Sequence, residues 1–140
     1  GVMTATARAM NPAGLVVDFR KAATPTFRFS SSALNQAQVV VQQGRALWAG
    51  NAELDRLIIY QGTANDVNPI YTRVITDPLN VFILPTFKAR GYYVEDIDMN
   101  GEAVFQGTGN DLEFIYQNII SNHPGNGLVL PFFTIREQLP

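Results

Sequence analysis

Residues 58–75 of this 140-residue chain read IIYQGTANDVNPIYTRVI, and residues 103–120 read AVFQGTGNDLEFIYQNII. Identical residues recur at a spacing of 45, among them Gln61, Gly62, Thr63, Asn65, Asp66, Ile70 and Tyr71, which recur as Gln106, Gly107, Thr108, Asn110, Asp111, Ile115 and Tyr116. Each copy has an apolar run, a Gly-Thr-Xaa-Asn-Asp turn and a second, alternating run. This pattern predicts a repeated unit of strand, connection and strand. The alternative is chance similarity between two short β segments.

Short apolar or alternating runs, bounded by turn residues about every 8–12 positions, continue on both sides of the repeat. The clearest lie within residues 36–43, 81–84 and 128–136. Asn100-Gly101 is typical of a type I′ hairpin turn. We find no amphipathic pattern that indicates a helix of ten or more residues. The sequence therefore predicts an all-β sandwich or barrel of about ten short strands.

The length fits one domain with one core. Residues 1–13 are small and polar and predict an extended N-terminal arm, or alternatively a frayed terminus. Residues 14–140 form the predicted β-sandwich domain, in which Phe27 and Phe29 share one face of an early strand. A short helical turn is predicted within residues 46–56, where Trp48 is expected to fill the core.

The composition argues against several classes of partner. Charged residues make up 16% of the chain, and the net charge of −2 includes no Lys/Arg cluster. We therefore expect no binding to nucleic acid. No apolar stretch is long enough to span a bilayer, and the first ten residues lack the apolar segment of a signal peptide. The chain has no cysteine, which excludes disulfides and thiolate metal sites.

The sequence at residues 96–102 resembles the start of a calcium-binding EF-hand loop. Asp96, Asp98 and Asn100 have the spacing of its first oxygen ligands, followed by Gly101. The twelfth position is Gly107 instead of a bidentate glutamate. We therefore expect a solvated hairpin and no metal or cofactor, and keep these three residues as weak metal candidates.

The sequence offers little for catalysis. His123 is the only histidine, and none of the serines that could accompany it lies in a Gly-Xaa-Ser-Xaa-Gly motif. We expect an exposed loop histidine and no enzyme. A sugar-binding stack of Trp48, Tyr92 and Tyr93 is a further alternative.

From Leu57 to the end, the chain resembles the single jelly-roll penton proteins of tectivirus-like, tailless, membrane-containing phages, and related small β-sandwich virion proteins. The resemblance rests on an apolar run ending at Pro85, a loop to Gly91-Tyr92-Tyr93, a hairpin, and an aromatic C-terminal run through Phe132 and Phe133. It does not extend to the N-terminal half.

This resemblance implies a single jelly roll of about 8–10 antiparallel strands in two sheets. It also implies a homopentamer at a capsid vertex, which contacts the major capsid protein and can support a spike, without direct membrane insertion. The alternatives are a phage decoration or tail-associated protein, or a carbohydrate-binding module. Our interface candidates are Val81, Phe82, Ile83, Leu84, Tyr92, Tyr93, Leu130, Phe132 and Phe133.

Overall fold

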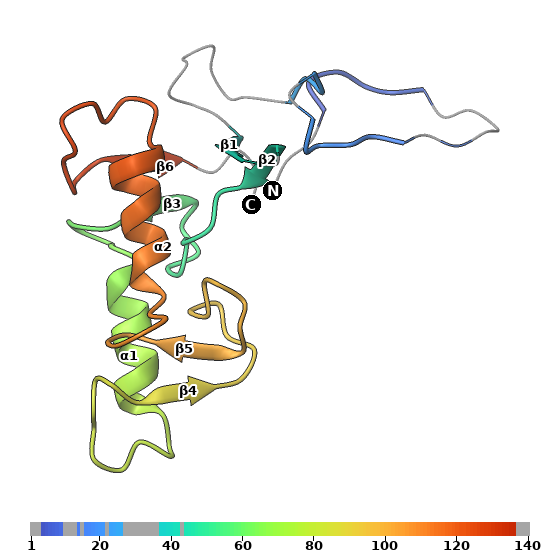
Figure 1. The fold of residues 1–140 in the computed structure, drawn as a ribbon. Helices are drawn as coiled ribbons and strands as arrows, with labels where there is room; N and C mark the ends of the chain where they lie inside the picture. Colours follow the sequence, from blue (N-terminus) through green and yellow to red (C-terminus); the bar gives the residue numbers. More distant parts are fainter. Residues whose placement is uncertain are drawn as a thin grey trace. The chain divides into compact units, whose positions relative to one another are not determined.

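The computed structural model describes residues 4–9, 14, 16–21, 23–26, 37–42 and 44–136 (Figure 1). The chain divides into two compact units, Gly1–Trp48 with Arg136–Pro140, and Ala49–Ile135. In the first unit, β1 (Gln38–Val41) pairs antiparallel with β2 (Gly44–Leu47). This confirms a strand in the β-branched run of residues 36–43. The strand predicted around Phe27 and Phe29 lies outside the described residues, as does part of the predicted arm.

The second unit carries the repeat. Its elements are β3 (Leu57–Ile59), α1 (Val67–Thr76), β4 (Lys88–Arg90), β5 (Glu102–Val104), α2 (Leu112–Gln117) and a π-helical turn, η1 (Asn118–Asn122). The last strand, β6, spans Thr134–Arg136. Among the described residues, the strands form three two-stranded sheets: β1–β2, β3–β6 and β4–β5.

The second half of each repeat copy is a helix, so the predicted strand–connection–strand unit is wrong. In α1 the fully buried side chains are Ile70 and Val74, four residues apart, whereas Thr72 between them is exposed. This is the spacing of one helix face and not of a strand. Pro69 is tolerated because it lies in the first turn, where its missing N–H has no helical acceptor. The predicted absence of any ten-residue helix is therefore also wrong.

The two copies are related by an approximate twofold arrangement. β4 of the first copy pairs with β5 of the second, and β6 of the second pairs with β3 of the first. Two edge-to-face aromatic pairs follow the same exchange: Tyr60 packs on Tyr116 at 5.2 Å, and Tyr71 packs on Phe105 at 4.9 Å between ring centroids. Since Tyr60 corresponds to Phe105 and Tyr116 corresponds to Tyr71, the two aromatic pairs are equivalent to each other. The second unit is thus a duplicated strand–helix–strand element whose halves complete each other.

The duplication is longer than residues 58–75 and 103–120. Its backbone repeats as well, because the non-glycine residues with positive φ in the first copy all have a positive-φ counterpart in the second: Leu54 with Met99, Arg56 with Gly101, Ala64 with Gly109, and Ile83 with Val129. We call residues 51–90 the first repeat and residues 96–136 the second repeat. The spacing is 45 up to the helices and 46 from Asp77 and His123 onward. The π-helical turn η1 accommodates this one extra residue.

Ala64 and Gly109 occupy the same turn, with φ of 54° and 71°. An L-residue in this region is strained by about 1–2 kcal/mol, which glycine avoids. We expect Ala64→Gly to raise the free energy of unfolding by about 0.5–1 kcal/mol and Gly109→Ala to lower it by about 1 kcal/mol. A Cβ at Gly109 would meet no atom within 4 Å, so its cost is conformational. Urea unfolding of both variants tests this, and a loss of stability in Ala64→Gly would contradict it.

Two predicted strands are replaced by turns. Residues 81–84 form an exposed turn, because the side chain of Asn80 binds both backbone polar groups of Leu84 and Ile83 has a φ of 53°. In the run from Leu128 to Arg136, only β6 is a strand. The preceding residues form a turn because the side chain of Asn126 binds both backbone polar groups of Leu130.

Two predicted turns also differ. Asn100-Gly101 does not form a two-residue hairpin turn but ends the connection of residues 91–101 between β4 and β5. The carboxylate of Asp96 accepts hydrogen bonds from the N–H groups of Asn100 and Gly101 and so fixes a separate turn. Residues 46–56 contain the end of β2 and bends instead of a helical turn, because Leu54 and Arg56 have positive φ.

The expectation of a β-rich chain with short strands is confirmed, with two short helices among the described residues. The described strands form small two-stranded sheets. They do not confirm the finer expectation of a two-sheet jelly roll. The core of the second unit lies between the helices and the strands, where Ile58, Ile115 and Ile119 are fully buried.

Candidate functional site

Asp66 and Asp111 are fully buried and fix the start of each helix. Asp66 accepts hydrogen bonds from the N–H groups of Glu53, at 3.1 Å, and Ile59, at 2.7 Å. The N–H of Asp66 in turn donates to the carbonyl of Ile59. The side chain thus ties the preceding loop and β3 to the first turn of α1.

Asp111 plays the same part in the second repeat. Its carboxylate accepts hydrogen bonds from the N–H groups of Ile97 at 2.7 Å, Asp98 at 3.3 Å and Val104 at 2.7 Å.

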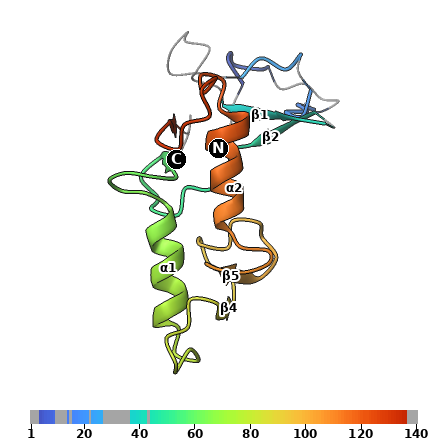
Figure 2. The same ribbon diagram turned by 60° about the vertical axis from the view of Figure 1, so that its left-hand side comes forward.

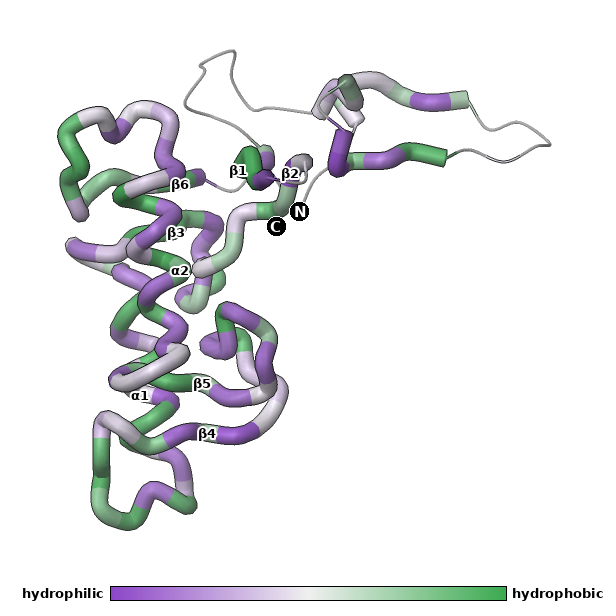
Figure 3. Tube along the Cα trace, in the orientation of Figure 1, coloured by the Kyte–Doolittle hydropathy of each residue, from purple (hydrophilic) through white to green (hydrophobic). Residues whose placement is uncertain are grey.

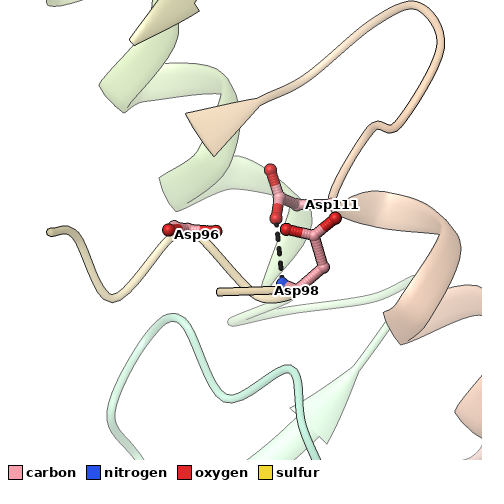
Figure 4. A group of neighbouring side chains, drawn as sticks. All are labelled: Asp96, Asp98 and Asp111. Carbon is pink, nitrogen blue, oxygen red and sulfur yellow. Dashed lines mark hydrogen bonds between the residues drawn. The ribbon is translucent and has the colours of Figure 1, made fainter. Parts of the chain in front are cut away.

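The structure brings together two of the weak metal candidates and Asp111, which the EF-hand-like spacing does not predict as a ligand. Carboxylate oxygens of Asp96, Asp98 and Asp111 lie within 4.8 Å of one another (Figure 4). Asn100 donates its backbone N–H to both Asp96 and Asp98, and its side-chain amide donates to Asp98. All three carboxylates therefore already accept hydrogen bonds from the chain.

The first repeat forms the same turn with Asn51 in place of Asp96. Asp55 donates its N–H to the side chain of Asn51, as Asn100 does to Asp96. Asp55 then accepts the N–H of Leu57, as Asn100 accepts that of Glu102. A neutral asparagine thus performs the part of Asp96, so this turn does not need a cation to form. We interpret the acidic cluster as a structural turn.

The buried aspartates make stability depend on pH. Burial raises the pKa of Asp66 to about 6, against an opposing effect of its backbone hydrogen bonds, and burial also raises the pKa of Asp111. A carboxyl group whose pKa is higher in the folded state binds its proton more tightly there, so its contribution to stability declines as pH rises.

We expect the wild type to lose stability relative to Asp66→Asn between about pH 4 and pH 6, by at most about 1.4 kcal/mol per pH unit. Above pH 6 the difference should be constant. Urea unfolding of both proteins at each pH provides the measurement. Parallel profiles across this window would contradict the assignment to Asp66.

Each helix leads into an apolar loop. The first apolar loop, residues 77–87, is held by the buried side chain of Asn80. Its amide donates to the carbonyls of Val74, at 2.8 Å, and Leu84, at 2.9 Å, and its oxygen accepts the N–H of Leu84 at 2.9 Å. One side chain therefore closes the loop and joins it to the last turn of α1.

The second apolar loop, residues 123–133, repeats this anchor with Asn126. Its amide donates to the carbonyls of Ile119, at 2.7 Å, and Leu130, at 2.8 Å, and its oxygen accepts the N–H of Leu130 at 2.8 Å. The two apolar loops lie at opposite ends of the pair of helices in both views (Figures 1 and 2).

Beyond their anchors, the apolar loops expose large hydrophobic side chains, which Figure 3 shows as green stretches at the two ends of the second unit. Phe82 is 80% exposed and Leu128 is 78% exposed. Residues 78–87 and 124–135 contain no ionisable side chain. The exposed apolar residues are Leu79, Val81, Phe82, Ile83 and Leu84 in the first loop, and Leu128, Val129 and Phe132 in the second. Contiguous exposed apolar surface of this kind marks interaction sites.

The tips of both loops hold strained backbone. Ile83 has a φ of 53° and Val129 a φ of 58°. β-branched residues are disfavoured in this region, at a cost of about 1–3 kcal/mol each. The three hydrogen bonds of each asparagine anchor offset this cost. Strain maintained at equivalent positions indicates that the conformation of the loops matters to what they do.

The remaining interface and sugar-stacking candidates do not form one platform. Tyr92 is fully exposed, while the ring of Tyr93 is covered by the guanidinium of Arg73, 4.3 Å from its centroid. Trp48 is buried, as expected. Phe133 packs between His123 and Phe132. The sugar stack of Trp48, Tyr92 and Tyr93 therefore has only Tyr92 freely presented.

His123 has a structural part in the second apolar loop. Its Nδ1 accepts the N–H of Gly125 at 3.0 Å, and its Nε2 lies 3.2 Å from the carbonyl of Thr134. In the first apolar loop, Asp77 takes the equivalent position and accepts the N–H of Leu79. Both ring nitrogens are thus engaged with backbone, which leaves neither positioned to act as a general base.

No family model, curated protein or solved structure matches this chain. In the part of the chain that the structure describes, no helix combines the length and the apolar character needed to cross a bilayer. The function must therefore be inferred from the geometry of the chain itself. The exposed apolar side chains of the two apolar loops contribute nothing to the buried core, so these loops are the candidate functional site.

Proposed function

We propose that this chain is a structural protein of a virus particle and that it works by docking to neighbouring protein subunits. The observation that carries the proposal is the pair of apolar loops, which are held by buried anchors and expose apolar side chains within stretches, residues 78–87 and 124–135, that contain no ionisable residue. Preorganised apolar surface of this kind favours protein association, because little conformational freedom is lost on binding.

The specific form we propose is a homopentamer at a fivefold vertex, which contacts the major capsid protein and can support a spike. The single jelly roll that the phage resemblance implies belongs to this specific form. Of the interface candidates, Phe82, Ile83 and Phe132 are well exposed and suit such contacts. The low share of charged residues, 16%, also suits a subunit whose sides are covered by neighbours.

Localisation tests the proposal. Antibody raised against the purified chain should label virus particles isolated by density gradient from the cells that encode it, with gold concentrated at particle vertices. Label distributed along tails or over the whole shell would favour a decoration or tail-associated protein. Absence of the chain from every particle fraction would contradict a virion role.

A further inference from the structure

The two repeats complete each other's sheets. Among the described residues, all four strands of the repeats pair across them, β4 with β5 and β3 with β6. The aromatic pairs of Tyr60 with Tyr116 and of Tyr71 with Phe105 also join the first repeat to the second. A repeat without the other would therefore have two unpaired strands, and unpaired strand edges readily pair with another chain.

One short segment, residues 91–95, joins the first repeat to the second, and we call it the hinge segment. Its contacts are weak. Tyr92 is fully exposed, and the two hydrogen bonds of Tyr93 are long, at 3.3 Å each. The Nε of Arg73 and the Oε2 of Glu95 lie 3.5 Å apart, and both atoms are buried without a hydrogen-bond partner among the described residues. Releasing the hinge segment therefore costs far less than separating the repeats.

The segment before the first repeat shows that the same stretch can be extended. Residues 46–50 correspond to the hinge segment at the spacing of 45, with Trp48 in the place of Tyr93. Ala46, the counterpart of Gly91, lies in the strand β2. Gly91 instead lies in a bend with a φ of 154°, where a Cβ would be 2.8 Å from the ring of Tyr93. Glycine thus stands where the chain bends, and alanine where the corresponding segment is a strand.

We propose that copies of this chain associate by exchanging repeats. With the hinge segment extended, the first repeat of one copy pairs with the second repeat of another copy through the contacts seen here within one chain. Such an exchange is a low-cost route to association, because the surfaces are already complementary. Two copies close a dimer, and more copies close a ring if successive rotations close.

This inference rests on the proposed function, because it names the contacts by which the virion subunit associates with itself. Within one chain, the tethered repeat has an effective concentration on the order of 1 mM. Exchange therefore requires a chain concentration in that range, as in an assembling particle.

The absence of cysteine from the chain allows a direct test. Ala89 and Ala103 are opposite each other in β4 and β5, at a separation that a disulfide can span. Ala89→Cys and Ala103→Cys, made as two separate variants, are mixed at about 1 mM, unfolded in urea, refolded together and oxidised. We expect a covalent dimer on a non-reducing gel, with residues 89 and 103 linked in its peptide map.

Val40→Cys mixed with Arg45→Cys is the matched control. These two residues are opposite each other in β1 and β2, which both lie in the first unit and outside the repeats. The control mixture should give only the background of random cross-linking. If either alanine variant does not fold, as judged by circular dichroism, Arg90→Cys with Glu102→Cys provides a second opposite pair in the same sheet.

Gly91→Ala tests the hinge segment itself. It gives the hinge segment the residue found in its extended counterpart and places a Cβ against Tyr93. We expect the associated fraction, measured by light scattering at a fixed chain concentration, to rise about 5-fold or more. Gly107→Ala is the control, because its φ is also positive but a Cβ there would meet no atom within 4 Å.

Several outcomes would overturn the inference. One is a link between residues 89 and 103 that is no more frequent than the background of the control mixture. Another is association of the wild type without this link, which would place the contact on another surface. A third is equal association of Gly91→Ala and Gly107→Ala, which would show that the hinge segment does not control the exchange. Because particle labelling is measured separately, failure of the exchange and failure of the virion role can be told apart.

Discussion

Replacing Asp111 with alanine is expected to lower the free energy of unfolding by about 3–5 kcal/mol. The carboxylate of Asp111 accepts the backbone N–H groups of Ile97, Asp98 and Val104, and the side chain is fully buried. Truncation leaves these donors without an acceptor. Each buried donor left unpaired costs about 1–3 kcal/mol, less where water enters. Urea unfolding followed by circular dichroism measures the loss.

Asp98→Ala is the matched control. Asp98 belongs to the same acidic cluster, but it is half-buried and its carboxylate accepts hydrogen bonds from Asn100 of its own turn. Its removal should cost no more than about 1 kcal/mol. Equal losses in the two variants, together with a rise in the melting temperature of the wild type on adding calcium, would contradict the structural interpretation and identify a cation site.

The sequence reveals the repeat but not its secondary structure. The Gly-Thr-Xaa-Asn-Asp segment shows that two stretches share a backbone, and the structure places them in equivalent positions. The following run predicts a strand because Ile70, Val74 and Ile75 are β-branched residues, which favour strands on propensity alone. The helix forms because it buries Ile70 and Val74 together against the rest of the unit. This tertiary packing overrides the local strand propensity and cannot be derived from the run alone.

The second half of the duplication was present in the sequence but hidden by a shift in spacing. Six further identities appear once the spacing is changed from 45 to 46: Pro78, Asn80, Leu84, Pro85, Phe87 and Arg90 recur as Pro124, Asn126, Leu130, Pro131, Phe133 and Arg136. A comparison that allows one inserted residue would have found them. The π-helical turn η1 is the structural form of that insertion.

The residues of the candidate site were partly predictable. The run from Val81 to Leu84 and the residues Leu130 and Phe132 were expected at subunit contacts, and an apolar run remains available for contact when it forms a turn. The prediction that this run is a strand was wrong. The run forms a turn because the buried side chain of Asn80 binds Leu84, and the sequence gives no sign of that contact.

Asn126→Ala is expected to lower the free energy of unfolding by about 2–4 kcal/mol. Asn126 is buried, and its side chain makes three hydrogen bonds, one to Ile119 and two to Leu130. Alanine would leave these backbone groups unpaired and would remove the restraint that holds Val129 at a φ of 58°. Asn122→Ala is the control, because Asn122 is exposed and its side chain donates a long hydrogen bond, 3.3 Å, to the side chain of Asn118, so the loss should stay within about 0.5 kcal/mol.

The equivalent anchor makes the test stricter. Asn80→Ala should cost a similar amount, since Asn80 makes the same three bonds in the first apolar loop. Because the loops lie at opposite ends of the helices and share no partner, the two losses should add in the double variant to within about 0.5 kcal/mol. A double variant no less stable than either single one would mean that the first substitution had already released both loops, and that the anchors do not act separately. If Asn126→Ala matched Asn122→Ala, the loop conformation would have to be maintained by its own apolar contacts instead of by the buried asparagine.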